Sequence, residues 1–133
     1  MRIFAAALAL IALAGIAIAQ ETGGRFDHNG SIVEVNWNGE HDFSINYIRP
    51  KPGIGVEYNT ILVDGWIGVD DQINATARVF KSGCNPATYE VTGTFDDNYF
   101  ELSGLAPARW NGCTPVGREW NEHSTLTFRR VRN

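Results

Sequence analysis

The spacing of the apolar residues constrains the fold of this chain more than any other feature. After Gln20, short runs in which apolar and polar residues alternate recur about every ten residues between turn-forming residues. Val33 and Val35 alternate with polar residues in one run, and Phe43 and Ile45 do so in the next. No segment carries a sustained apolar repeat of about 3.6 residues, as an amphipathic helix would. The chain is therefore predicted to be all-β.

The loop between these two runs is predicted to contain an odd number of residues. A two-residue loop of Asn38 and Gly39 would pair Val35 with Asp42, and the apolar residues of the two runs would then face opposite sides. An odd loop keeps them on one side. The simplest odd loop is a type I turn over Trp37 and Asn38, followed by Gly39 in the left-handed conformation.

Further alternating runs predict a second strand pair around Asp70 and Asp71, a third pair across an even loop at Asp97 and Asn98, and a closing strand. Trp66, in the middle of one run, is predicted to lie in the core. Seven or eight antiparallel strands joined mostly by short turns predict an up-and-down barrel or a small sandwich, with the barrel preferred. The runs lie at 60–69, 73–80, 88–95, 99–105 and 124–131.

The two cysteines, Cys84 and Cys113, are predicted to form a disulfide. Extending the register of the third pair beyond its strands sets Cys84 nearly opposite Asn111, two residues from Cys113. A single cysteine pair in an exported chain favours a disulfide over a catalytic thiol or a cysteine-based zinc site. A disulfide that closes a loop of this length stabilises a fold by about 3 to 4 kcal/mol.

Residues 1–19 are predicted to be a signal peptide that is cleaved before Gln20. Arg2 precedes an apolar run that ends on the small-residue pattern of Ala17 and Ala19. An uncleaved membrane anchor is the alternative, but the run is shorter than the roughly 20 residues that a spanning helix needs. No cysteine stands where a lipid would be attached, so no membrane anchor is expected after cleavage. Residues 20–133 are then a single domain, located in the periplasm or secreted.

The net charge of the chain limits which class of macromolecule it is expected to bind. The chain has 11 Lys and Arg against 15 Asp and Glu, so removal of Arg2 leaves 10 against 15, a net charge of −5 with neutral histidines. An acidic surface repels phosphate backbones. Nucleic acid is therefore not a predicted partner.

Sequence signals of catalysis are few. The chain contains no G-x-S-x-G, no H-E-x-x-H and no glycine-rich phosphate loop. The three histidines, His28, His41 and His123, each stand beside a carboxylate, but their spacing does not predict a shared metal site. No metal and no cofactor is predicted. A hydrolase of unknown type stays as an alternative, because histidines and carboxylates are present.

Residues 106–123 are the predicted binding loop. This stretch shows no alternation, and it holds two prolines, two glycines and two of the four tryptophans. Trp110 and Trp120 are suited to stack on a sugar or to anchor a protein interface. The alternative is that both indoles plug one end of the barrel. The polar contacts would come from Arg109, Arg118, Glu119, Glu122 and His123.

Two stretches of the mature chain resemble small exported proteobacterial proteins of unknown function. They are FDHNGSIVEV at 26–35 and TARVFKSGCNPATYEVTG at 76–93, which contain the D-H-N-G-S start and one of the paired cysteines. The resemblance covers most of the mature chain. It implies a periplasmic location, but no activity and no catalytic residues.

Together these features predict a small soluble binding module without enzymatic activity. Its ligand is expected to be a glycan or a protein of the cell envelope. A proteinaceous inhibitor of a cationic, lysozyme-like enzyme is an alternative, because a small acidic barrel is electrostatically complementary to a basic target.

Overall fold

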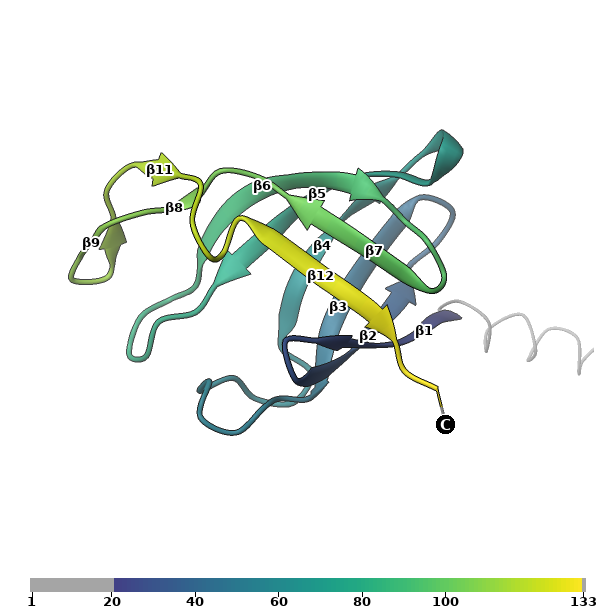
Figure 1. The fold of residues 1–133 in the computed structure, drawn as a ribbon, viewed down its shortest axis with the longest axis horizontal. Coiled ribbons are helices and arrows are strands. Elements are labelled where there is room, and N and C mark those ends of the chain that lie inside the picture. The colour runs from purple at the N-terminus through teal and green to yellow at the C-terminus, as the bar shows by residue number, and fades with distance from the viewer. Residues whose placement is uncertain (1–20, 133) are drawn as a thin grey trace, which may run out of the picture.

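Eight antiparallel strands close into a barrel in the computed structural model, which describes residues 21–132 (Figure 1). Each strand pairs with the next along the chain, and the last one returns between the seventh and the first. The all-β prediction is confirmed, and the barrel rather than the sandwich is correct. The strands are β1 (Glu21–His28), β2 (Ser31–Trp37), β3 (Asp42–Arg49), β4 (Ile61–Ile67), β5 (Gln72–Val79), β6 (Ala87–Thr94), β7 (Tyr99–Ser103) and β12 (Thr125–Arg130).

The remaining elements are short. A 3-10 turn, η1 (Val69–Asp71), connects β4 to β5. Four two-residue strands lie between β7 and β12 and form an arm beside the barrel (Figure 1). They are β8 (Ala106–Pro107), β9 (Trp110–Asn111), β10 (Thr114–Pro115) and β11 (Arg118–Glu119). Within residues 21–132 no helix is long and apolar enough to cross a membrane. The predicted signal peptide at 1–19 lies outside the described residues.

Strand β1 was not among the predicted strands, because apolar and polar residues do not alternate in its sequence, ETGGRFDH. Among residues 22–28 of this strand only Phe26 and His28 are buried, and the register shifts at Gly23 between Thr22 and Gly24. Glycine is favoured at residue 24, because its backbone φ of 106° lies in the region that L side chains rarely adopt. The strand therefore combines a bulge with a positive-φ residue, and neither favours the usual strand-forming residues.

The β2–β3 hairpin confirms the odd loop but not its predicted length. Trp37 pairs with Phe43 and Val35 pairs with Ile45, so the apolar side chains share the inner face. Five residues, 38–42, separate the paired Trp37 and Phe43, and Trp37 belongs to β2 instead of the turn. Gly39 has a positive φ of 108°, as predicted.

Replacing Gly39 by alanine is expected to lower the free energy of unfolding by about 1 kcal/mol or more. A Cβ at Gly39 would meet nothing within 4 Å, so the cost comes from the left-handed backbone alone. The asparagine variant at the same position is the control, because asparagine tolerates this conformation better. Urea denaturation of both variants measures the difference, and equal losses would show that the backbone conformation is not the cause.

The other two hairpins follow the predicted pattern. Residues 69–71 form the turn of the second pair as η1. In the third, Thr92 pairs with Ser103 and Gly93 with Leu102, which centres an even loop on Asp97 and Asn98. The even register of that hairpin is confirmed.

Aromatic side chains fill one end of the barrel. The Phe100 ring stacks on Phe128 with centroids 4.7 Å apart and meets the edge of Phe26 at 5.3 Å. Trp37 continues this cluster near the β2–β3 turn, and the Arg130 guanidinium lies 4.8 Å from the centroid of Phe26. The opposite end, where β1 meets β2 and β3 continues into its loop, is not filled in this way.

Trp66 lies on the outside of the barrel, so its predicted core position is wrong. Its side chain is 46% exposed and lies beside the His41 ring, with centroids 5.2 Å apart. The register of β4 explains this, because Val63 and Gly65 face inward and a Cβ at Gly65 would be 2.5 Å from Ala75 Cα. A tryptophan at the next position must then face solvent.

Candidate functional site

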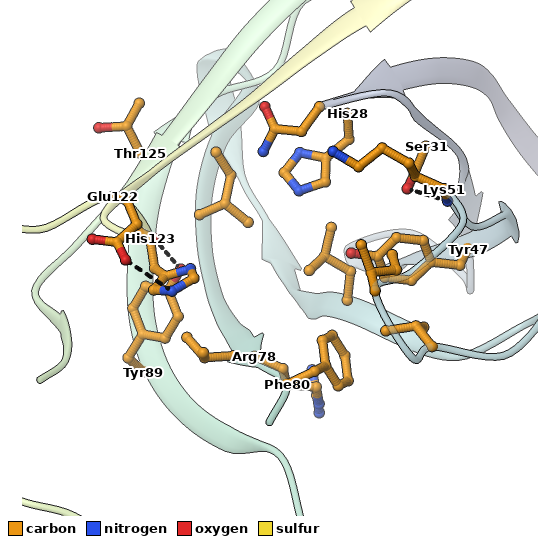
Figure 2. A pocket seen from close by; sticks show the side chains of 16 residues that line it. His28, Ser31, Tyr47, Lys51, Arg78, Phe80, Tyr89, Glu122, His123 and Thr125 are labelled. Atoms are coloured by element: carbon orange, nitrogen blue, oxygen red, sulfur yellow. Dashed lines mark hydrogen bonds and ion pairs between the residues drawn. The ribbon is translucent and has the colours of Figure 1, made fainter. Parts of the chain in front are cut away.

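A cavity of about 350 Å³ opens at the unfilled end of the barrel. Its walls come from the β1–β2 turn, the β3–β4 loop, the ends of β5 and β6, and residues 122–126 (Figure 2). Segments far apart in the sequence therefore meet there. The polar lining residues include His28, Tyr47, Lys51, Tyr89, Glu122 and His123.

The β1–β2 turn forms one side of the mouth. Asn29 and Gly30 have φ angles of 52° and 94°, as in the two-residue turns that suit tight hairpins. Ser31, just after the turn, accepts a hydrogen bond from the backbone N–H of Lys51 through its Oγ at 2.8 Å. A Cβ at Gly30 would lie 3.0 Å from Lys51 Cδ, so the lysine stem crosses the turn in close contact. The turn and the β3–β4 loop thus hold Lys51 at the mouth.

A bulge in β4 supplies part of the apolar wall. Ile45 pairs with Val63 and Asn46 pairs with Ile61, which leaves Leu62 as an extra residue. Leu62 and Val63 are consecutive and both buried, which a regular strand with one wet face would not allow. The bulge therefore turns Leu62 into the barrel, where it lines the cavity.

His28 is the buried titratable group of the cavity. Its Nδ1 donates to the backbone oxygen of Thr127 at 3.1 Å, and its ring stacks on Phe128 with centroids 5.0 Å apart. Burial lowers the pKa of His28 below 6.5, because the charged ring loses hydration; the bond to Thr127 only partly opposes this. The neutral ring keeps its proton on Nδ1, so Nε2 is an acceptor.

Acidification from pH 6.5 to pH 5 is expected to destabilise the protein through His28. The pKa of this ring is lower in the folded state than in the unfolded state, so the unfolded chain binds the proton first. Stability is then complete above pH 6.5 and falls as the pH drops toward the folded-state pKa, by at most about 1.4 kcal/mol per pH unit. Denaturation midpoints across this window measure the effect. The loss should shrink in His28→Gln and persist in His41→Gln, and an unchanged loss in His28→Gln would contradict the assignment.

Two tyrosines contribute hydroxyl groups to the cavity. Burial raises the pKa of Tyr47 to about 12, and burial together with the nearby Tyr47 raises the pKa of Tyr89 to about 12. The Tyr89 hydroxyl donates to the backbone oxygen of His123. Tyr47 is only 5% exposed, and its hydroxyl has no hydrogen-bond partner among the described residues. A buried hydroxyl without a partner costs about 1 to 3 kcal/mol, so this group is suited to a molecule that enters the cavity.

The predicted site residues fall into two groups. Glu122 and His123 line the cavity, with 3.7 Å between the Glu122 carboxylate and His123 Nε2. The other predicted residues lie on the arm and do not line the cavity. They are Arg109, Trp110, Arg118, Glu119 and Trp120.

The arm corrects the prediction that 106–123 is irregular. Its pairs keep one antiparallel register, from Ala106 with Glu119 to Asn111 with Thr114. Backbone hydrogen bonds between Ala108 and Gly117 and between Arg109 and Val116 join the short strands. The hairpin was missed because prolines and glycines interrupt its strands. Burial does not alternate here either, because Ala106, Pro107 and Ala108 are all buried and Trp110 is half-buried.

The predicted disulfide between Cys84 and Cys113 is confirmed, and it fastens the tip of the arm to the β5–β6 loop. Lys81 reinforces the same contact, since its Nζ donates to the backbone oxygen of Gly112 at 2.7 Å and lies 5.2 Å from the Trp110 ring. Gly112 has a positive φ of 67°. Both Trp-Asn-Gly stretches therefore place their glycine in a left-handed turn.

The two tryptophans of the arm differ in their surroundings. Trp110 is half-buried and packs against the core cluster. Trp120 is 63% exposed. Neither indole plugs the barrel, whose closed end contains Trp37 instead.

No group of three or more His, Cys, Asp or Glu side chains is placed to hold a metal ion within 21–132. His28 and His123 line the cavity, whereas His41 lies outside the barrel beside Trp66. Function is therefore inferred from the cavity and its lining. The chain matches no family model, no curated protein and no solved structure.

Proposed function

We propose that the protein is a non-enzymatic, exported binding protein that holds one small molecule at the open end of its barrel. The observation that carries this proposal is the buried Tyr47 hydroxyl, which lacks a partner among the described residues and lies in a cavity of about 350 Å³. Eight-stranded barrels are wide enough to hold either packed side chains or one small ligand. Aromatic rings fill one end of this barrel, and the other end is left for a ligand.

The size of the cavity favours a small molecule over the glycan polymer or protein expected from residues 106–123. A volume of about 350 Å³ lies at the lower end of the range of about 300 to 1,000 Å³ that is typical of small-molecule sites. The cavity walls are barrel strands and hydrogen-bonded loops, so the site is largely pre-formed. A pre-formed site lowers the entropic cost of binding.

Binding rather than catalysis fits the titratable groups of the cavity. Tyr47 and Tyr89, with pKa values of about 12, stay protonated at neutral pH and are poor general bases. His28 uses Nδ1 to bind a backbone oxygen instead of a carboxylate that would stabilise its charged form.

The two cysteines and the N-terminal segment bear on where the protein is located. The Cys84–Cys113 disulfide indicates an oxidising compartment outside the cytoplasm. The predicted signal peptide and the resemblance to exported proteobacterial proteins favour the periplasm within that class.

Binding of N-phenyl-1-naphthylamine, an uncharged fluorescent probe, tests the proposed function. The probe should bind the wild-type protein. Ile54→Trp should weaken this binding by about tenfold or more, because the larger ring would fill part of the cavity. Ile54 is half-buried in the β3–β4 loop, outside the barrel strands, so the barrel itself is preserved.

Leu105→Trp is the matched control, because it adds the same ring at an exposed position outside the cavity. This variant should bind the probe like the wild type. Failure of the probe to bind, or equal binding to the wild type and Ile54→Trp, would contradict the proposal.

A further inference from the structure

We infer that the ligand is an organic anion with an apolar body, and that its acidic group is held at the cavity mouth by the Lys51 ammonium and the Tyr47 hydroxyl. This inference rests on the proposed binding function and adds the chemical class of the ligand. It follows from the distribution of charge around the cavity, the position of Lys51 and the composition of the walls.

Lys51 is the cation at the mouth that remains uncompensated. Arg78, the other basic side chain that lines the cavity, is paired with Asp64 at 2.8 Å. Lys51 forms no ion pair with any residue of the described part of the chain. The Glu122 carboxylate lies beside His123 on the other side of the mouth (Figure 2).

The side chain of Lys51 is directed by its neighbours. Its backbone N–H is bonded to Ser31, and its stem crosses Gly30, which brings the ammonium beside the His28 ring (Figure 2). The pKa of His28 reflects this, since it is lowered by burial first and, to a smaller degree, by the positive charge of Lys51. The ammonium is thus positioned over the cavity instead of extending freely into solvent.

The net negative charge of the protein shows why the positive charge of Lys51 matters for anion binding. The full chain carries a net charge of −4 and contains two lysines, Lys51 and Lys81. Lys81 is bonded to Gly112 on the arm. An acidic protein repels anions at long range, so anion binding at the mouth depends on the local Lys51 and not on the general field.

Tyr47 complements the lysine as a neutral donor. Its pKa of about 12 keeps the hydroxyl protonated, and the hydroxyl points into the cavity (Figure 2). A hydroxyl that donates to an anionic oxygen forms a charge-assisted hydrogen bond, which is stronger than a neutral one.

The remaining walls select the body of the ligand. The apolar part of the lining consists of aliphatic and aromatic side chains from the β3–β4 loop, β4, β5, the start of the β5–β6 loop and β12. They are Ile54, Val56, Leu62, Val79, Phe80 and Leu126. An apolar body buries against these side chains while its acidic group stays at the mouth.

Two fluorescent probes with one body test the inference. 1-Anilinonaphthalene-8-sulfonate and N-phenyl-1-naphthylamine differ only in the sulfonate group. The wild-type protein should bind the sulfonate about tenfold more tightly, because it gains a charge-assisted contact. Lys51→Gln should lose about tenfold in affinity for the sulfonate and leave the affinity for the neutral probe unchanged. Lys51 is exposed, so this substitution should not disturb folding.

Lys81→Gln is the control, because it removes the same charge from a position outside the cavity. It should change the affinity for neither probe. Tyr47→Phe, which deletes only the hydroxyl, should weaken sulfonate binding by about threefold or more without lowering stability.

The outcomes separate the inference from the proposed function. If both probes bind equally to the wild type and to Lys51→Gln, the cavity binds small molecules and the anion inference is wrong. An equal loss of sulfonate binding in Lys51→Gln and Lys81→Gln would show general charge attraction and would also overturn it. If neither probe binds, the proposed function itself fails.

Discussion

Replacing Phe100 by alanine is expected to lower the free energy of unfolding by about 3 to 5 kcal/mol. The side chain is 3% exposed, stacks on Phe128 and meets the edge of Phe26. Its removal leaves a void at the centre of the aromatic cluster, and the rigid barrel strands can close around it only in part. Urea denaturation of the purified protein measures the loss.

Tyr99→Ala is the matched control on the same strand. Tyr99 is half-exposed and covered on one side by Arg129, whose guanidinium carbon lies 4.8 Å from the ring centroid. Its removal should cost about 1 kcal/mol or less, as is usual for surface positions. Similar losses in the two variants would contradict the assignment of the aromatic cluster as the core.

Replacing Cys84 and Cys113 together by alanine is expected to lower the free energy of unfolding by about 3 to 4 kcal/mol. The disulfide closes a loop with a sequence separation of 29 residues, so its loss raises the conformational entropy of the unfolded chain. Both cysteines lie outside the barrel strands, so the β-sheet signal in circular dichroism should persist.

Reductant provides the control for this prediction. It should destabilise the wild type by a similar amount and leave the double-alanine variant unchanged. A loss of stability below about 1 kcal/mol in both experiments would show that the disulfide between the arm and the β5–β6 loop does not restrict the conformations of the unfolded chain.

The barrel could be predicted because most of its strands obey a period of two. The apolar positions of β2 and β3 require an odd loop, and those of β6 and β7 require an even one; both were found. The latter register also predicted the partner of Cys84. The alternation within each strand and the odd or even number of loop residues were sufficient to predict these features, since the features depend on neighbouring strands only.

Other features depend on contacts between distant residues and could not be predicted in the same way. The bulge of β1 at Gly23 forms only in the pairing with β2, and the exposure of Trp66 follows from the close approach of Gly65 to β5. The arm was missed because its two prolines and two glycines interrupt the sequence pattern of its two-residue strands.

The cavity combines three residues that the sequence keeps apart. His28 ends the first strand, Tyr47 lies near the end of the third, and Lys51 follows in a loop. Each has an ordinary local role in a strand or a loop, so no motif marks them. Glu122 and His123 were predicted as binding residues, but the reason given for them was their proximity to the two tryptophans of the arm.

The most direct test of the cavity as the binding site is a titration of the exported, disulfide-bonded protein with N-phenyl-1-naphthylamine, followed by ¹H–¹⁵N correlation spectra. The naphthyl ring shifts the resonances of groups that it contacts. The largest shifts are predicted at the backbone amides of His28, Tyr47 and Leu62, with the indole N–H signals of Trp110 and Trp120 unchanged, because neither indole lines the cavity. Shifts confined to those two indoles and the arm would contradict the account and would place binding on the arm.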